Sequence, residues 1–304
     1  MAGRRYPSRD VDGIVLLDKP GGLTSNQALQ RTKRLFMASK AGHTGSLDPL
    51  ATGMLPICLG QATKVSSFLL DAAKHYLVAC RLGSATDTGD SDGTLIQRHD
   101  GPPVEQSVLL AALEKFKGPQ QQVPPMYSAL KHRGQPLYKL ARKGIEIERK
   151  PRAITVYDLR LDSYAWPEFR CRVHCSKGTY VRTLVADIAA ALGTLGHVTA
   201  LRRLSVGPFE GARMLTLEEL ESEALLGMQT LDRHLLPSDA ALPDWPLIEL
   251  DAAAASRLIQ GQKLPPNPDF MPGAVRVYGP ERRFLGVADV SEGGQLVARR
   301  LFVS

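Results

Sequence analysis

Apolar residues along the chain recur with two periods, which predict intermingled strands and helices. The apolar run at residues 13–20 predicts a buried strand, ended by a Pro-Gly-Gly turn. Thr24 and Gln27 have the spacing of a helix capping box, so we expect a helix from there to about residue 36. Further strands are expected at residues 55–59, 76–82, 153–161 and 169–174, and further helices at 65–72, 106–116, 135–142 and 181–192. Prolines are expected to interrupt regular structure at residues 119–125.

The order of these elements favours a mixed α/β (α+β) fold with a central mixed sheet, because no strand–helix–strand unit repeats. Residues 237–246 are poor in charge and rich in Ala and Pro, which suits a linker. Beyond the linker, one helix signal at 252–258 is followed by short strand signals. We therefore expect two domains, residues 1–245 and residues 250–304, the second a small β-rich unit that leans on the first.

Composition is that of a globular protein. The chain has 304 residues, of which 43% are hydrophobic and 23% charged, and no apolar run approaches the ~20 residues that span a bilayer. The amino terminus is basic and lacks the hydrophobic region of a signal peptide. We therefore expect a cytoplasmic protein without membrane association, and a monomer by default.

Metal sites are not expected. The chain has four cysteines, Cys58, Cys80, Cys171 and Cys175, without disulfide-framework spacing. A site of Cys171, Cys175 and His174 is disfavoured, because strand alternation turns the histidine away from both thiols, and we interpret the cysteines as core residues. The acidic stretch 88–93 imitates part of a calcium loop, but His99 stands where a glutamate is needed.

Positive charge is concentrated in one segment. The whole chain carries +7, whereas residues 131–182 alone have thirteen Lys or Arg against five Asp or Glu, a net +8. Residues 210–251 have ten acidic residues against two arginines, a net −8. A local basic region of this size suggests a polyanionic partner, most simply nucleic acid. A solvated basic face is the alternative.

One carboxylate stands nearly alone in a glycine- and proline-containing loop, residues 42–53. Gly45 and Gly53 allow backbone conformations that other residues avoid, and Pro49 favours an extended backbone at Asp48. A lone aspartate in a stiff loop suggests a nucleophile. The alternative is that Asp48 caps a turn, the commoner role of Asp beside Gly and Pro.

Five ordered motifs carry a resemblance to a known family. They are Asp18-Lys19-Pro20, the loop 42–53, and residues 125–131, 176–182 and 201–204. Together they strongly resemble the TruB family of tRNA pseudouridine synthases over residues 13–210. The resemblance implies a pseudouridine synthase fold with a largely antiparallel central sheet flanked by helices. Residues 250–304 resemble, less strongly, the small RNA-binding PUA domain of bacterial members.

The resemblance implies isomerisation of uridine to pseudouridine at nucleotide 55, in the T loop of tRNA, with Asp48 as the essential catalytic residue. Nothing is oxidised or added, so no cofactor is implied. Whether Asp48 attacks C6 of the base or the ribose carbon stays open. An RNA-binding or tRNA-folding protein in which catalysis is secondary is the alternative. An aspartate-nucleophile glycosidase is disfavoured, because the motifs offer no second carboxylate.

The resemblance also assigns roles to individual residues. Arg182 would pair with Asp48 and keep its carboxylate ionised. Tyr76 would stack on the uracil ring and help to remove the C5 proton. Tyr180 and Leu201 would be further walls of the base pocket. Without the family match, Tyr76, Tyr180 and Leu201 would be interpreted as ordinary core residues.

A uridine inside a folded RNA loop has to be flipped out before a buried carboxylate can reach it. The resemblance assigns His43 to the space that the uridine leaves. The expected contacts to RNA phosphates involve basic residues of the motifs and the basic segment. These candidates are Lys19, Lys131, Arg133, Lys139, Arg142, Lys143, Lys177 and Arg202.

Overall fold

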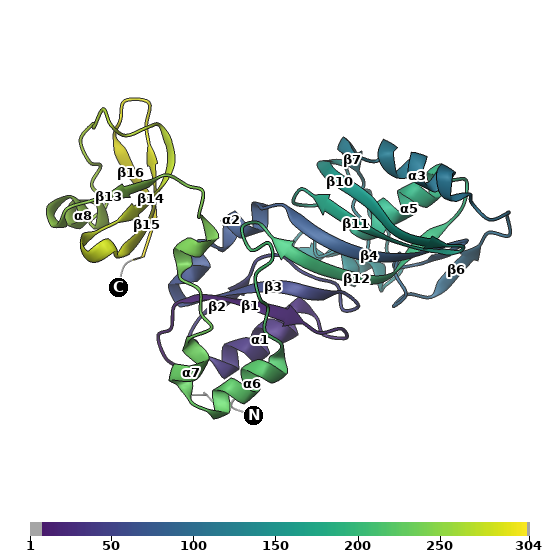
Figure 1. The fold of residues 1–304 in the computed structure, drawn as a ribbon, viewed down its shortest axis with the longest axis horizontal. Helices are drawn as coiled ribbons and strands as arrows, with labels where there is room; N and C mark the ends of the chain where they lie inside the picture. Colours follow the sequence, from purple (N-terminus) through teal and green to yellow (C-terminus); the bar gives the residue numbers. More distant parts are fainter. Residues whose placement is uncertain (1–7, 303–304) are drawn as a thin grey trace.

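The computed structural model describes residues 8–302, an elongated molecule with a main sheet and a second, smaller sheet at one end (Figure 1). The basic amino-terminal residues 1–7 lie outside the described part. Within residues 8–302, none of the helices has the length and apolar run needed to cross a bilayer.

The main sheet is mixed and largely antiparallel, as the resemblance implies. Its strands follow the order β1 (Gly13–Lys19), β3 (Thr52–Leu59), β12 (Gly196–Val206), β4 (Lys74–Leu82), β11 (Glu168–Cys175), β10 (Arg152–Ala165) and β7 (Gly118–Gln122), with β2 (Ala41–His43) also paired to β3. β12 runs parallel to β3 and antiparallel to β4. The parallel contact joins Thr52 to Arg202 and Gly53 to Arg203, so it brings β12 beside the end of the Asp48 loop.

The two halves of this sheet differ in burial, and their sequences explain the difference. β1 and β3 are nearly continuous apolar runs buried on both faces. β4 and β11 alternate, with Cys171 and Cys175 buried and His174 on the opposite, more exposed face. The predicted alternation and the buried cysteines are thus confirmed.

Helices cover the sheet according to these patterns (Figure 1). α1 (Ser25–Leu35), α6 (Leu217–Leu225) and α7 (Met228–Asp232) pack together at the β1 end, whereas α3 (Gln106–Lys115) and α5 (Val181–Ala191) pack on β10 and β12. η1 (Gly60–Lys64), α2 (Ser66–Asp71) and η2 (Ser238–Ala241) lie near the join with the second sheet. A hairpin, β5 (Ser84–Thr86) and β6 (Leu95–Arg98), extends from β4, and a basic segment holds β8 (Lys131–His132), β9 (Gln135–Pro136) and α4 (Leu137–Ala141).

Most of the expected elements are present, with two corrections. The capping box of Thr24 and Gln27 forms at the start of α1, as predicted. The prediction that residues 119–125 interrupt regular structure was wrong for residues 119–122, because Pro119 lies in β7, where it is tolerated at the edge of the sheet. The segment 237–246 is more than a linker, because it contains η2 and buries Ala241 and Leu242.

The second sheet has its own core and also contacts the first part of the chain. It consists of β13 (Leu247–Glu249), β14 (Gly273–Tyr278), β15 (Phe284–Val290) and β16 (Leu296–Leu301), with α8 (Ala252–Ile259) and η3 (Pro280–Arg282). Its Phe284, Val287 and Phe302 pack into the apolar cluster beside α2. Lys64 Nζ donates a 2.6 Å hydrogen bond to the Leu301 carbonyl across the same contact.

Candidate active site around Asp48

The loop that carries Asp48 is held by side chains from β1 and α1. Ser25, the first residue of α1, donates its hydroxyl to the Leu47 carbonyl (3.1 Å) and accepts the Leu47 N–H (2.7 Å). Lys19 donates to the carbonyls of Pro20, Leu23 and Pro49, which joins the loop to the end of β1. These contacts fix the backbone on both sides of the carboxylate, which supports the stiffness that the sequence predicts.

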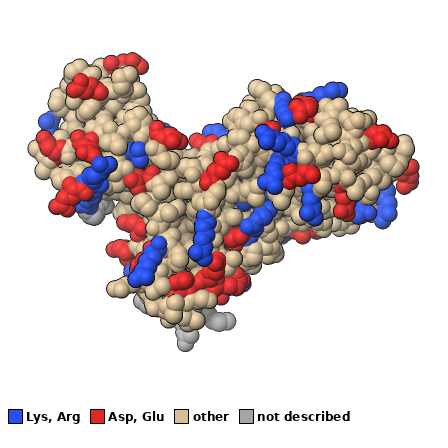
Figure 2. Space-filling view, in the orientation of Figure 1, with Lys and Arg blue, Asp and Glu red and all other residues tan. Residues whose placement is uncertain are grey.

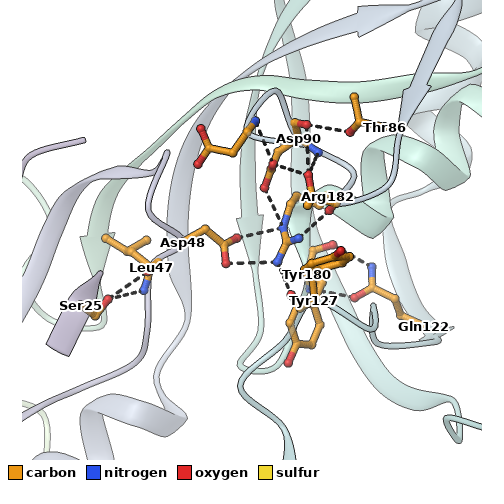
Figure 3. A network of polar contacts seen from close by, with 11 residues as sticks. Ser25, Leu47, Asp48, Thr86, Asp90, Gln122, Tyr127, Tyr180 and Arg182 are labelled. Atoms are coloured by element: carbon orange, nitrogen blue, oxygen red, sulfur yellow. Dashed lines mark hydrogen bonds and ion pairs between the residues drawn. The ribbon is translucent and has the colours of Figure 1, made fainter. Parts of the chain in front are cut away.

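Asp48 forms a bidentate ion pair with Arg182, the second residue of α5 (Figure 3). Arg182 Nε lies 2.9 Å from Asp48 Oδ2, and Nη2 lies 3.1 Å from Oδ1. The Arg182 side chain is only 5% exposed, whereas that of Asp48 is 37% exposed. The carboxylate therefore keeps an accessible side while both of its oxygens are held in one orientation.

Further acceptors hold the Arg182 guanidinium in place (Figure 3). Nη1 donates to the Thr88 carbonyl (2.6 Å), Nη2 donates to the Tyr127 carbonyl (2.7 Å), and Nε lies 3.5 Å from Asp90 Oδ2. Asp90 is itself buried and accepts a 2.6 Å hydrogen bond from the Thr88 hydroxyl. A buried arginine with two carboxylates and two carbonyls around it has little freedom to move.

Asp48 lines a cavity of about 360 Å³, within the ~300–1,000 Å³ range of small-molecule sites. Tyr76 of β4, Tyr180 before α5 and Leu201 of β12 line the same cavity. Tyr180 is fixed by Gln122 of β7, which accepts the Tyr180 N–H (2.8 Å) and donates to the Tyr180 carbonyl (3.2 Å). Segments far apart in the sequence thus place two aromatic rings and one apolar side chain around one carboxylate.

Burial sets the protonation of these groups. Burial raises the pKa of Asp48 above 3.8, the Arg182 charge opposes this shift, and the Asp90 carboxylate adds to it. Burial likewise raises the pKa of Tyr76 above 10.0, against the influence of the Arg203 guanidinium. The cavity therefore presents a phenol that is neutral at neutral pH and a carboxylate whose ionised form Arg182 favours.

Two residues that line the Asp48 cavity, Arg203 and Lys74, were not predicted as site residues from the sequence. Arg203 of β12 is only 1% exposed, and its guanidinium donates to the carbonyls of Met54 (2.7 Å) and Gly45 (3.2 Å). Lys74 is also buried and donates to carbonyls at the end of α2, and burial lowers its pKa to about 8. The only sequence signal was the position of Arg203 inside the motif 201–204. Asp90 was likewise missed, since its loop was considered only as a calcium loop.

His43 lies apart from the other predicted site residues. It belongs to β2, opposite Ile57 of β3, and is not among the residues that line the Asp48 cavity. Its Nδ1 is buried and finds no hydrogen-bond partner within residues 8–302. Burial lowers the pKa of His43, so the ring is neutral at neutral pH.

The expected phosphate contacts need one correction. Lys19 is fully buried, and its ammonium is bound by three carbonyls of its own chain, so it does not reach an RNA backbone. Arg202 forms a bidentate pair with Asp18, at 2.9 and 2.6 Å, and remains partly exposed. The other candidates are exposed: Lys131, Arg133, Lys139, Arg142, Lys143 and Lys177.

Charge is unevenly distributed over the molecule. On the face in Figure 2, Lys and Arg side chains are scattered over the main sheet, and acidic side chains gather over α6. The acidic area agrees with the net −8 of residues 210–251. The same face also carries Lys and Arg side chains on the smaller domain, so basic residues are not confined to the main sheet.

Comparison with known proteins gives the same assignment along the whole chain. Residues 33–181 match the TruB family pseudouridylate synthase (N terminal domain), residues 182–243 match a tRNA pseudouridylate synthase B C-terminal domain, and residues 246–302 match Pseudouridine synthase II TruB, C-terminal. The tRNA pseudouridine synthase B of Nitrosococcus oceani is 50% identical over 303 residues, covering 99% of this chain and 98% of that protein. Its counterpart in Aeromonas salmonicida is 50% identical over 308 residues, covering 98% and 96%.

Solved structures show the same fold at lower identity. An archaeal box H/ACA sRNP Nop10–Cbf5 complex contains a chain with a TM-score of 0.72 and 23% identity, covering 96% of this chain and 86% of that one. An H/ACA RNP bound to a substrate RNA containing 2′-deoxyuridine gives a TM-score of 0.74 at 22% identity, covering 96% and 85%.

The family matches and the similar relatives place the chain in the class of pseudouridylate synthases, which are isomerases, and the fold agrees with this class. Within that class, the chain belongs to the TruB family.

Proposed function

We propose that this chain isomerises uridine to pseudouridine at nucleotide 55 in the T loop of tRNA, with Asp48 as the nucleophile. The observation that carries the proposal is the bidentate Arg182–Asp48 pair in a cavity walled by Tyr76 and Tyr180. The choice of tRNA is supported by relatives that are called tRNA pseudouridine synthase B and are about 50% identical over nearly the whole chain.

In this reaction the bond from uracil N1 to the ribose breaks, and a bond from C5 to the same ribose carbon forms. C5 loses a proton and N1 gains one, so the product is an isomer and no oxidant or reductant is consumed. Asp48 attacks either C6 or the ribose carbon, and the bond that it forms is broken again when the product is released. Both routes need the ionised carboxylate, which Arg182 stabilises and orients.

Tyr76 would lie against the flipped uracil and assist proton transfer at C5. Its pKa is raised by burial, so the neutral hydroxyl is the form present in the cavity. The hydroxyl would therefore relay the C5 proton rather than hold a negative charge. Tyr180 and Leu201 would complete the pocket around the base, and His43 would contact the RNA from β2, outside this pocket.

We propose that residues 1–245 form the catalytic domain and that residues 250–304 form a PUA-like RNA-binding domain. The exposed basic residues of the segment 131–143 would contact phosphates of the tRNA T arm. A monomer in the cytoplasm, acting without an obligatory protein partner, would be sufficient for this reaction.

The proposal is tested with tRNA tritiated at uracil C5, from which pseudouridine formation releases tritium. We expect release by the parent protein and none by Asp48→Asn. Asp244→Asn is the matched control, because Asp244 is exposed and its carboxylate forms no ion pair or hydrogen bond within residues 8–302, and it should release tritium normally. Equal release by the parent and Asp48→Asn, or none by either, would reject the enzyme in favour of an RNA-binding protein.

A further inference from the structure

A second cavity, of about 420 Å³, lies at the ends of β4 and β11, away from the residues assigned to catalysis. Its walls come from the end of β4, the β5–β6 hairpin, the turn between β10 and β11, and β12. Ser91 and Gly93 of the loop between β5 and β6 line it, while Asp90 of the same loop faces Arg182. One loop therefore borders both this cavity and the catalytic ion pair.

An aromatic wall of this cavity is provided by Trp166. The ring is only partly buried and lies close to Gly83, where a Cβ would be 3.8 Å from Trp166 Cζ2. The backbone around it is fixed, because Leu82 N–H donates to the Pro167 carbonyl and Gly83 N–H donates to the Leu195 carbonyl, both at 2.8 Å. A fixed, partly open indole is suited to stacking with a planar ring.

Cationic and polar groups converge on the same space. Arg98 is exposed and forms no ion pair with the residues between 8 and 302. Arg81 has a 3.4 Å contact with Glu168 and is 50% exposed, so its guanidinium can take another partner. His197 is buried and donates Nδ1–H to the Ser84 carbonyl (3.0 Å), which leaves Nε2 as its second polar atom. Asp100 contributes one carboxylate to the lining.

We propose that this cavity is a second binding site for a phosphate-bearing nucleotide, with the base on Trp166 and the phosphate on Arg81 and Arg98. Arginine is the side chain best matched to phosphate geometry, and an adjacent aromatic ring provides the stacking surface that a nucleobase needs. The nucleotide belongs either to the RNA substrate, at a position other than the flipped uridine, or to a free mononucleotide. Both sources share this chemistry.

Trp166 serves as the reporter. The chain has two tryptophans, so Trp245→Phe leaves Trp166 as the only source of indole fluorescence. In that background, the full chain is titrated with UMP, with uridine and with a T-arm RNA. We expect saturable quenching in which UMP binds at least about tenfold more tightly than uridine, because the phosphate adds charge-assisted hydrogen bonds to Arg81 and Arg98.

Arg98→Gln should weaken the quenching about tenfold. Arg31→Gln removes another exposed arginine that forms no ion pair within residues 8–302, and should leave the quenching unchanged. Thermal unfolding checks that both variants are folded. Arg98-dependent quenching by UMP identifies a site for free nucleotide, and Arg98-dependent quenching by RNA alone identifies a nucleotide of the substrate. No quenching, or quenching that Arg98→Gln leaves unchanged, overturns the proposal.

Discussion

At the scale of single residues, the Asp48 carboxylate is subject to two opposing influences. Burial raises its pKa and Arg182 lowers it, and the net shift is upward from 3.8. The Asp90 carboxylate, which lies 3.5 Å from Arg182 Nε, adds to the upward shift. Arg182 thus contacts two carboxylates at once, and a substitution of Arg182 removes the positive charge or the hydrogen bonds beside both of them.

The first prediction concerns the pH dependence of the chemical step. Because the nucleophile must be ionised and its pKa is raised, the rate should fall on acidification at a higher pH than for an ordinary aspartate, whose pKa is 3.8. Single-turnover rates at saturating enzyme, measured against pH, give the midpoint of this fall. A midpoint at or below 3.8 would contradict the role of burial.

The second prediction is that Arg182→Lys keeps the positive charge but loses most of the activity. A lysine cannot bind both Asp48 oxygens and the carbonyls of Thr88 and Tyr127 in one plane, so the carboxylate should lose its orientation. We expect a fall of about 10²-fold in the single-turnover rate, the scale of a ~1 Å misplacement. Arg202→Lys is the control, because it breaks a similar bidentate pair with Asp18. Equal losses in both variants would indicate a general structural effect.

At the scale of elements, periodicity predicted those parts of the sheet and its helices in which burial follows a local pattern. α1 is specified by its capping box, and β4 and β11 by their alternation. β12 was not predicted as a strand, because its buried Arg203 depends on carbonyls of Met54 and Gly45, about 150 residues away. No local signal marks an arginine as buried when its acceptors come from a distant loop.

The candidate site likewise contains one residue that its local sequence marks and others that only distant contacts bring together. Asp48 stood out from its own loop, since Gly45 and Gly53 do take positive φ values of 119° and 96°. Arg182, Tyr76, Tyr180 and Leu201 could be placed near it only by family resemblance, because their meeting depends on strand order in the sheet. Asp90 and Gln122 act through other residues, and nothing in their local sequence indicates those partners.

The third prediction tests the junction between β3 and β12. A Cβ on Gly53 would overlap the Arg203 carbonyl oxygen and would also need the unfavourable φ, so Gly53→Ala should separate the two strands. Gly22→Ala is the matched control, because Gly22 also has positive φ, at 78°, but a Cβ there meets nothing within 4 Å. Urea unfolding should show a loss of free energy of unfolding for Gly53→Ala that exceeds the control by ~1–3 kcal/mol. Equal losses would mean that the strands can adjust.

At the scale of the whole molecule, the two sheets are joined by an apolar contact rather than by a free tether. Phe68 of α2 packs edge-on against Trp245, with ring centroids 4.8 Å apart, and Phe284 and Phe302 belong to the same cluster. Tyr278 donates a 2.6 Å hydrogen bond to Asp239 beside this contact. The second sheet is therefore held in a defined position beside the main sheet (Figure 1).

The fourth prediction is that removal of residues 250–304 weakens tRNA binding more than it slows the chemical step. The residues that line the Asp48 cavity all lie before residue 204, so the ion pair remains complete without the second sheet. Binding is measured by filter retention, and the chemical step by single-turnover rates at saturating enzyme. Because the truncation exposes Phe68 and Trp245 to solvent, it is combined with Phe68→Ser to keep the shortened protein soluble. A collapse of the rate with affinity intact would contradict this division.

The segregation of charge leads to the last prediction, which concerns salt. Exposed basic residues such as Lys139 and Lys143 lie in the net +8 segment, so a phosphate-dominated interface should release counterions and weaken steeply as salt is added. Lys139→Gln and Lys143→Gln should each reduce the slope of log affinity against log salt by about 1, and should weaken different tRNAs to the same extent. Arg34→Gln is the control, because this exposed arginine lies on α1, the helix that packs beside acidic α6. If the slope is flat in the parent, or if Arg34→Gln changes it as much as the lysine variants do, binding does not depend on this basic segment.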